Sequence, residues 1–127
     1  MARPAAKELT QRELEVMHVF WKRGELTATE ARDRLAEQGI DRAYVTVANL
    51  VRLLVEKGFL EQINAERPFQ YRPVREFQDV SRSLVRDLVQ RVFLGSREEM
   101  LVQVLGQNKL TAKERAVLEQ ILKEQEK

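Results

Sequence analysis

Residues 41–58, DRAYVTVANLVRLLVEKG, constrain the fold of this chain more than any other stretch. Asp41 is a favourable residue for starting a helix, and Gly58 is a favourable residue for ending one. Between them, apolar residues recur at three- and four-residue spacing: Val47, Leu50, Val51 and Leu54. This spacing predicts an amphipathic helix with one buried face. Lys57, beside the end of this helix, fits a favourable interaction with the helix dipole.

The opposite face of this predicted helix is polar and carries few acidic residues. Its side chains are Arg42, Tyr44, Thr46, Asn49 and Arg52. Arg, Asn and Thr can bond to base edges or phosphates, and a recognition helix carries such residues near its N-terminal end. We therefore predict that all five contact DNA. The alternatives are ordinary solvent exposure for the polar residues and, for Tyr44, packing on the preceding helix.

Two further helices are predicted before this one. Thr10 and Glu13 form a capping box that starts the first, and Gly24 ends it. A second capping box, Thr27 with Glu30, starts the next helix. Only residues 38–41 separate this helix from the third, which is the short turn of a helix-turn-helix.

Residues 59–72 predict a β-hairpin directly after the third helix. Segments 59–63 and 69–72 partly alternate apolar and polar residues, and a polar tip joins them. Arg67 lies at this tip, where it would meet a phosphate or the minor groove. Three helices followed by such a hairpin describe a mainly α winged helix-turn-helix domain, which we assign to residues 1–74.

Residues 75–127 predict a C-terminal helical module. Ser96 and Thr111 are expected to cap two of its helices. The apolar surface is too wide for short helices to bury alone, so we predict dimerisation. The dimer residues would be Val80, Leu84, Leu88, Val92, Leu101, Leu105, Leu118, Ile121 and Leu122. A two-fold dimer would place two recognition helices on an inverted repeat.

Composition excludes several other functions. The 22 basic and 20 acidic residues nearly cancel, so bulk charge does not indicate the partner. The chain has no cysteine and one histidine, and no catalytic, cofactor or metal motif is recognisable, so we expect neither an enzyme nor a cofactor. With no signal peptide or membrane-spanning run, we expect a cytoplasmic protein.

Several motifs together resemble the penicillinase repressor (BlaI/MecI/CopY) family of winged-helix regulators. They are LTQRELEVMHVFWKRGELTATEARDRL, AYVTVANLVRLLVEKGFL, the wing exit FQYRPV and the tail LTAKERAVLEQIL. They occur in the family's order and at close to its spacing, over nearly the whole chain.

The resemblance implies a homodimeric transcriptional repressor that binds an inverted-repeat operator and is released by a signal acting on the dimer. It implies that Tyr44, Thr46 and Asn49 face DNA and that Arg67 approaches the backbone. Asn49 replaces the family's usual Thr and Leu53 its usual Arg, so the preferred bases would differ. A protein-binding winged helix without DNA binding is the alternative.

The resemblance also bears on the releasing signal. In β-lactam-responsive members an Asn-Phe bond in the dimer module is cleaved, and the implied partner is a membrane-bound sensor protease. The aligned pair in this chain is Gln103-Val104, which departs from that site. Without cysteine, a copper switch of the family's kind is excluded.

Overall fold

The computed structural model describes residues 9–126. The chain divides into two compact units, Met1–Val85 and Arg86–Lys127. The division falls within one helix, α4 (Phe77–Arg91), whose first residues belong to the first unit. Our expected domain boundary between residues 74 and 75 lies just before this helix and stays a prediction.

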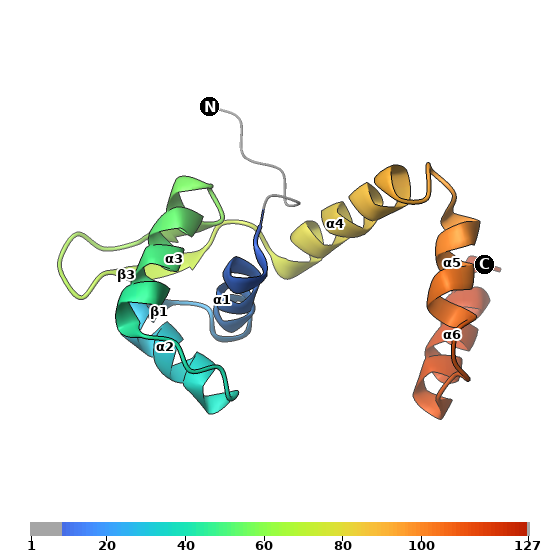
Figure 1. Ribbon diagram of the computed structural model, residues 1–127, viewed down its shortest axis with the longest axis horizontal. Coiled ribbons are helices and arrows are strands. Elements are labelled where there is room, and N and C mark those ends of the chain that lie inside the picture. Colours follow the sequence, from blue (N-terminus) through green and yellow to red (C-terminus); the bar gives the residue numbers. More distant parts are fainter. Residues whose placement is uncertain (1–8, 127) are drawn as a thin grey trace. The chain divides into compact units, whose positions relative to one another are not determined.

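The first unit is a winged helix, as predicted (Figure 1). Its elements are α1 (Gln11–Arg23), β1 (Leu26–Thr27), α2 (Ala28–Glu37), α3 (Tyr44–Glu56), β2 (Leu60–Gln62) and β3 (Gln70–Pro73), followed by the start of α4. Strand β3 pairs antiparallel with both neighbours, which gives the order β1-β3-β2. The pairing of Leu26 with Tyr71 was not predicted, because a two-residue strand leaves no alternating pattern in the sequence.

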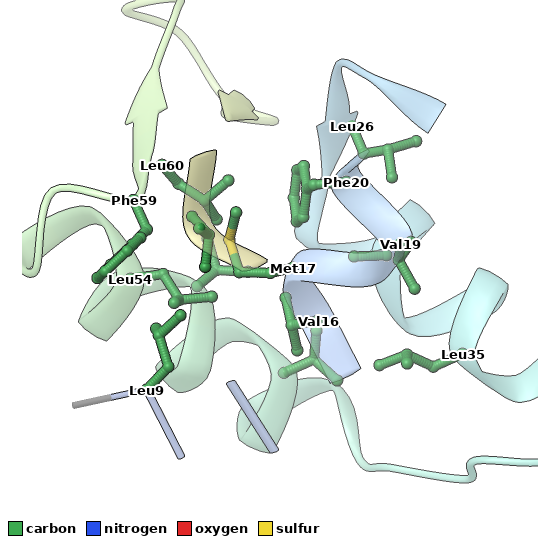
Figure 2. Packing of buried hydrophobic residues seen from close by; sticks show 14 residues of the cluster. Leu9, Val16, Met17, Val19, Phe20, Leu26, Leu35, Leu54, Phe59 and Leu60 are labelled. Atoms are coloured by element: carbon green, nitrogen blue, oxygen red, sulfur yellow. The ribbon is translucent and has the colours of Figure 1, made fainter. Parts of the chain in front are cut away.

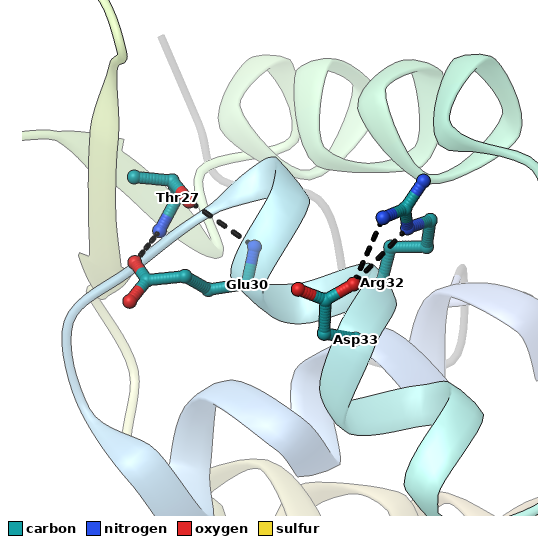
Figure 3. A network of polar contacts seen from close by, with 4 residues as sticks. All are labelled: Thr27, Glu30, Arg32 and Asp33. Carbon is teal, nitrogen blue, oxygen red and sulfur yellow. Dashed lines mark hydrogen bonds and ion pairs between the residues drawn. The ribbon is translucent and has the colours of Figure 1, made fainter.

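The helix starts follow the predicted caps in two cases and depart from them in the third. Capping boxes join Thr10 to Glu13 and Thr27 to Glu30, the second of which is drawn in Figure 3. Helix α3, however, begins at Tyr44 after Ala43, which makes no side-chain cap. Asp41 was predicted to cap this helix and does not, because the helix begins later in the chain and Ala43 occupies the N-cap position.

The core of the first unit joins α1, α2 and α3 to the sheet and to the start of α4. Its largest fully buried side chains include Phe20, Phe59 and Met17 (Figure 2). Val80 of α4 is also fully buried in this core, and Leu84 packs against it. The Trp21 indole N–H donates to the carbonyl of Arg75 over 2.8 Å, which further fixes the segment leading into α4.

This packing corrects one expectation about the dimer surface. We expected Val80 there, but it is a core residue because the first turn of α4 completes the winged helix. Leu84 is likewise partly covered by the same core. The apolar stripe of α4 therefore serves the first unit at its beginning and becomes exposed only further along, at Leu88 and Val92.

The second unit contains the end of α4, α5 (Arg97–Leu105) and α6 (Ala112–Gln125). Ser96 caps α5 by accepting from the Glu99 N–H, and Thr111 forms a capping box with Glu114. No residue of either helix is buried. Among the described residues, no helix is both long and apolar enough to cross a membrane.

Candidate nucleic-acid interface

The outer side of α3 presents one straight row of exposed residues. They follow each other at helical spacing: Val45, Asn49, Arg52 and Glu56. Val47, Val51 and Leu54 lie on the opposite side and are buried in the core. We call the first set the outer row of α3. Because the core holds the other side, this row is presented in a fixed orientation to whatever the protein binds.

Two of the predicted DNA-reading residues occupy this region with different exposure. Asn49 is exposed in the outer row, whereas Thr46 flanks the row and is half-buried. Arg52 is exposed and pairs with Glu56 over 2.8 Å, one turn further along. Exposed pairs of this kind contribute little to stability, so the Arg52 guanidinium can exchange Glu56 for another anion at small cost.

Arg42 is held differently from the prediction. Its guanidinium binds Glu15 of α1 over 3.2 Å, and both side chains are less than a third exposed. The interaction fastens the segment before α3 to α1. The contact with Glu15 uses only Nη2 of Arg42, and the contact of Arg42 with a phosphate stays a prediction.

The wing, residues 63–69, is organised by Asn64. Its side-chain amide donates to the carbonyls of Glu66 and Pro68, and its side-chain oxygen accepts from the Gln70 N–H. Arg67 is exposed at the tip, as predicted, with its guanidinium 5.4 Å from the centre of the Phe69 ring. The ring supports a cation that remains open to solvent on its other side.

A hollow of about 460 Å³ lies between the wing, the start of α2 and the start of α3. It is lined by Thr27, Ala28, Thr29, Tyr44, Arg67, Pro68, Phe69 and Tyr71. The first turn of α2, drawn in Figure 3, carries the positive end of the helix dipole, which the Glu30 carboxylate of the capping box partly offsets, and Arg67 adds a full positive charge. The hollow therefore suits a negatively charged group such as a phosphate.

Tyr44 and Arg67 both lie near enough to Tyr71 to affect the pKa of its hydroxyl. Burial raises the pKa of the Tyr71 hydroxyl, and the nearby Tyr44 raises it further, whereas Arg67 acts in the opposite direction. Tyr44 itself is 47% exposed. It lines the hollow together with Tyr71, and its ring is accessible to a ligand there.

A buried ion pair supports the far end of α3. The Lys57 ammonium lies 2.9 Å from the Glu13 carboxylate, and the Glu13 side chain is only 1% exposed. Burial raises the pKa of this carboxyl. The hydrogen bond and charge of Lys57, together with the hydrogen bond from the Thr10 N–H, lower the pKa by more than burial raises it, so the net shift is downward. The sequence showed Glu13 only as a cap and Lys57 only as a helix-end cation, because their contact spans 44 residues.

The predicted dimer residues of the second unit are mostly exposed. Leu101, Ile121 and Leu122 are about half exposed, and Leu88 and Val92 are 42% and 63% exposed. Leu105 and Leu118 are less exposed and line a hollow of about 350 Å³ between α5 and α6. Gln103 and Val104 are both exposed on α5. Within residues 9–126, no group of three acidic or histidine side chains could hold a metal ion.

Comparison with known proteins shows which family the chain is similar to. The family model described as the penicillinase repressor matches residues 9–124 of the chain. The chain belongs to the penicillinase repressor family. This confirms the resemblance found in the sequence, and it covers both units.

Curated members of the penicillinase repressor family match at similar length. The penicillinase repressor of Bacillus licheniformis is 26% identical over 117 residues, covering 92% of this chain and 91% of that protein. The methicillin resistance regulatory protein MecI of Staphylococcus aureus is 24% identical over 115 residues, covering 91% and 93%. The solution structure of the DNA-binding domain of the repressor BlaI is 26% identical, with a TM-score of 0.52. It covers 61% of this chain and 93% of that one.

Proposed function

We propose that this protein is a transcriptional repressor that binds a specific DNA sequence as a homodimer. The observation that carries the proposal is the outer row of α3, whose Asn49 and Arg52 are exposed on the side of the helix opposite the core. An α-helix fits the major groove, and Asn and Arg are residues that distinguish base edges there. Family membership supports the same interpretation, since the family and its curated relative from Bacillus licheniformis are described as the penicillinase repressor.

The proposal assigns each part of the first unit a task. The outer row of α3, flanked by Thr46 and Tyr44, would read bases. The hollow beside the wing would hold a backbone phosphate between Arg67 and the start of α2. Arg42 would orient the recognition helix through Glu15 rather than bind DNA first.

The homodimer is supported by the second unit. Its helices leave Leu101, Ile121 and Leu122 about half exposed in a single chain. Such a surface exceeds what a short helical unit leaves open unless a partner covers it. A second copy of the same unit would supply an equivalent apolar surface and would align two α3 helices on an inverted repeat.

A signal that releases DNA would then act on the second unit, because separating the two copies removes the additional affinity that comes from binding two half-sites. Gln103 and Val104 are exposed and would be reachable on α5. Their peptide bond is helical, so a protease such as a membrane-bound sensor would have to unwind α5 locally before cutting. A cytoplasmic location is part of this proposal.

The test is selection of binding sites from random duplex DNA, followed by mobility-shift titration of the selected duplex over rising salt. We expect an inverted repeat to be enriched and log K to fall linearly with log salt, because phosphate contacts release counterions. Binding that is equal for random and selected duplexes would reject sequence-specific repression. Absence of DNA binding even at low salt would favour the protein-binding winged helix instead.

Asn49→Ala is expected to weaken binding to the selected duplex by about tenfold per half-site, within the range of about 1–3 kcal/mol for one base contact. Binding to random DNA should change little, because Asn49 carries no charge. Thr46→Ala should also weaken binding to the selected duplex more than to random DNA, but by a smaller factor, since Thr46 is half-buried. Titrations of each variant against both duplexes measure the ratio of the affinity for the selected duplex to that for random DNA. An unchanged ratio would show that the residue does not contact a base.

Arg67→Ala is expected to weaken binding to selected and random duplexes alike and to reduce the salt slope by about one counterion for each bound copy, or about two for the dimer. The reason is that an exposed wing-tip cation beside the hollow meets the backbone, which is the same for every sequence. Arg86→Ala is a charge-matched control, because it removes an exposed arginine from the second unit. A loss confined to the selected duplex would show instead that Arg67 reads a base.

A further inference from the structure

We propose that Val45 is a specificity residue that contacts the 5-methyl group of a thymine in the major groove. This inference rests on the proposed function and adds a base preference to it. Val45 is 66% exposed and occupies the N-terminal position of the outer row of α3, one turn before Asn49. It therefore lies where a recognition helix approaches bases most closely.

The fold gives Val45 no evident structural task. The core of the first unit uses Val47 and Val51 from the same helix, and Val45 is neither part of that cluster nor packed against it. A β-branched residue is also a poorer helix former than most polar alternatives at an exposed position. An isolated exposed apolar side chain is common by itself, so its placement is what matters.

That placement limits the chemistry of the contact. The outer row continues with Asn49 and Arg52, so the apolar side chain stands at the head of a row of groups that can hydrogen-bond. Base edges in the major groove offer donors, acceptors and a single apolar group, the thymine methyl. Val45 can satisfy none of the donors or acceptors. Against the methyl it would bury apolar surface on both sides, which favours a T·A pair at that position.

The experiment removes only the methyl from DNA. The site enriched by wild-type protein is rebuilt as a series of duplexes, each with one thymidine replaced by deoxyuridine. One position per half-site should weaken wild-type binding about fourfold, the equivalent of burying one methyl group at about 0.8 kcal/mol. Val45→Ala should bind the thymidine duplex more weakly and lose most of the difference between thymidine and deoxyuridine at that position. Circular dichroism checks that Val45→Ala remains folded.

Asn49→Ala serves as the matched control. It alters the neighbouring residue of the same row, so it should weaken binding while keeping the deoxyuridine effect at the position assigned to Val45. If no sequence is enriched at all, the proposed function fails and this inference falls with it. If a sequence is enriched but no thymidine is sensitive, or Val45→Ala keeps the full sensitivity, the inference alone is overturned.

Discussion

Leu88→Asp is expected to convert the protein from dimer to monomer and to weaken binding to an inverted repeat along with it. Leu88 is 42% exposed on α4, beside Val85 and Val92, which are 48% and 63% exposed. In a dimer that covers this surface, the new carboxylate would have to leave water without a partner. Such a burial costs at least about 3 kcal/mol, which raises the dimer dissociation constant by a factor of about a hundred or more.

Sedimentation equilibrium measures this dissociation constant directly, and mobility shifts on selected duplexes with one or two half-sites measure the consequence. The monomer should bind the single half-site with the affinity of the wild-type protein. It should lose only the additional affinity that the wild-type dimer gains from the second half-site. Gln90→Asp is the matched control, because it places the same charge on the opposite side of α4 at an exposed position. A dimer that persists in Leu88→Asp would show that α4 lies outside the interface, and a wild-type monomer would reject the homodimer itself.

Lys57→Met is expected to destabilise the winged helix by about 3 kcal/mol at neutral pH, the loss typical of breaking a buried ion pair by removing one partner. Methionine keeps most of the aliphatic stem, so the main change is the missing ammonium. Glu13 would then hold a buried carboxylate that still accepts a hydrogen bond from the Thr10 N–H. Urea unfolding followed by circular dichroism measures the free energy of unfolding.

The pH dependence of this loss distinguishes its cause. In the wild-type protein the Glu13 pKa is lowered, so its contribution to stability is present above the unfolded value of about 4.3 and disappears as pH falls through the folded pKa. In Lys57→Met, burial acts without its counter-charge and should raise the Glu13 pKa above the unfolded value. Protonation then removes the unpaired buried charge. The difference in the free energy of unfolding between the two proteins should therefore shrink as pH falls from 7 toward 4.

A double-mutant cycle with Glu13→Gln provides the control. If the ion pair is responsible, Lys57→Met should cost much less in the Glu13→Gln background, because no buried charge is left unpaired. If Lys57 acts only on the dipole of α3, the loss should be the same in both backgrounds and nearly independent of pH. The second result would reduce the Glu13–Lys57 contact to a minor role.

The exposed side of α3, which we propose faces DNA, was predictable from the sequence in its main outline. The apolar stripe of Val47, Val51 and Leu54 determined which side of α3 is buried, and therefore left Asn49 and Arg52 on the other side. The prediction from the sequence named only polar residues on this side and therefore left out the exposed Val45. Its position one turn before Asn49 was a usable signal, since the outer row repeats at helical spacing.

Arg42 and Val80 show what the same reasoning could not supply: the dimer-surface prediction for Val80 was wrong, and the DNA contact of Arg42 stays a prediction. Both were placed by periodicity on a surface, Arg42 toward DNA and Val80 toward a second copy. The structure engages Arg42 with Glu15 and buries Val80 in the core. Periodicity gives the direction of a side chain around its own helix, but which neighbour covers that side depends on how separate helices pack.

The sequence by itself determined the features that depend on a few adjacent residues. Caps such as Thr10 with Glu13 and Thr27 with Glu30, the apolar face of α3 and the wing after it are encoded within one or two helical turns. Only the tertiary structure decided that β1 joins the sheet, that Lys57 meets Glu13 and that the first turn of α4 completes the winged-helix core. These contacts join residues far apart in the chain, so their free energy is gained only when the helices and the sheet pack together.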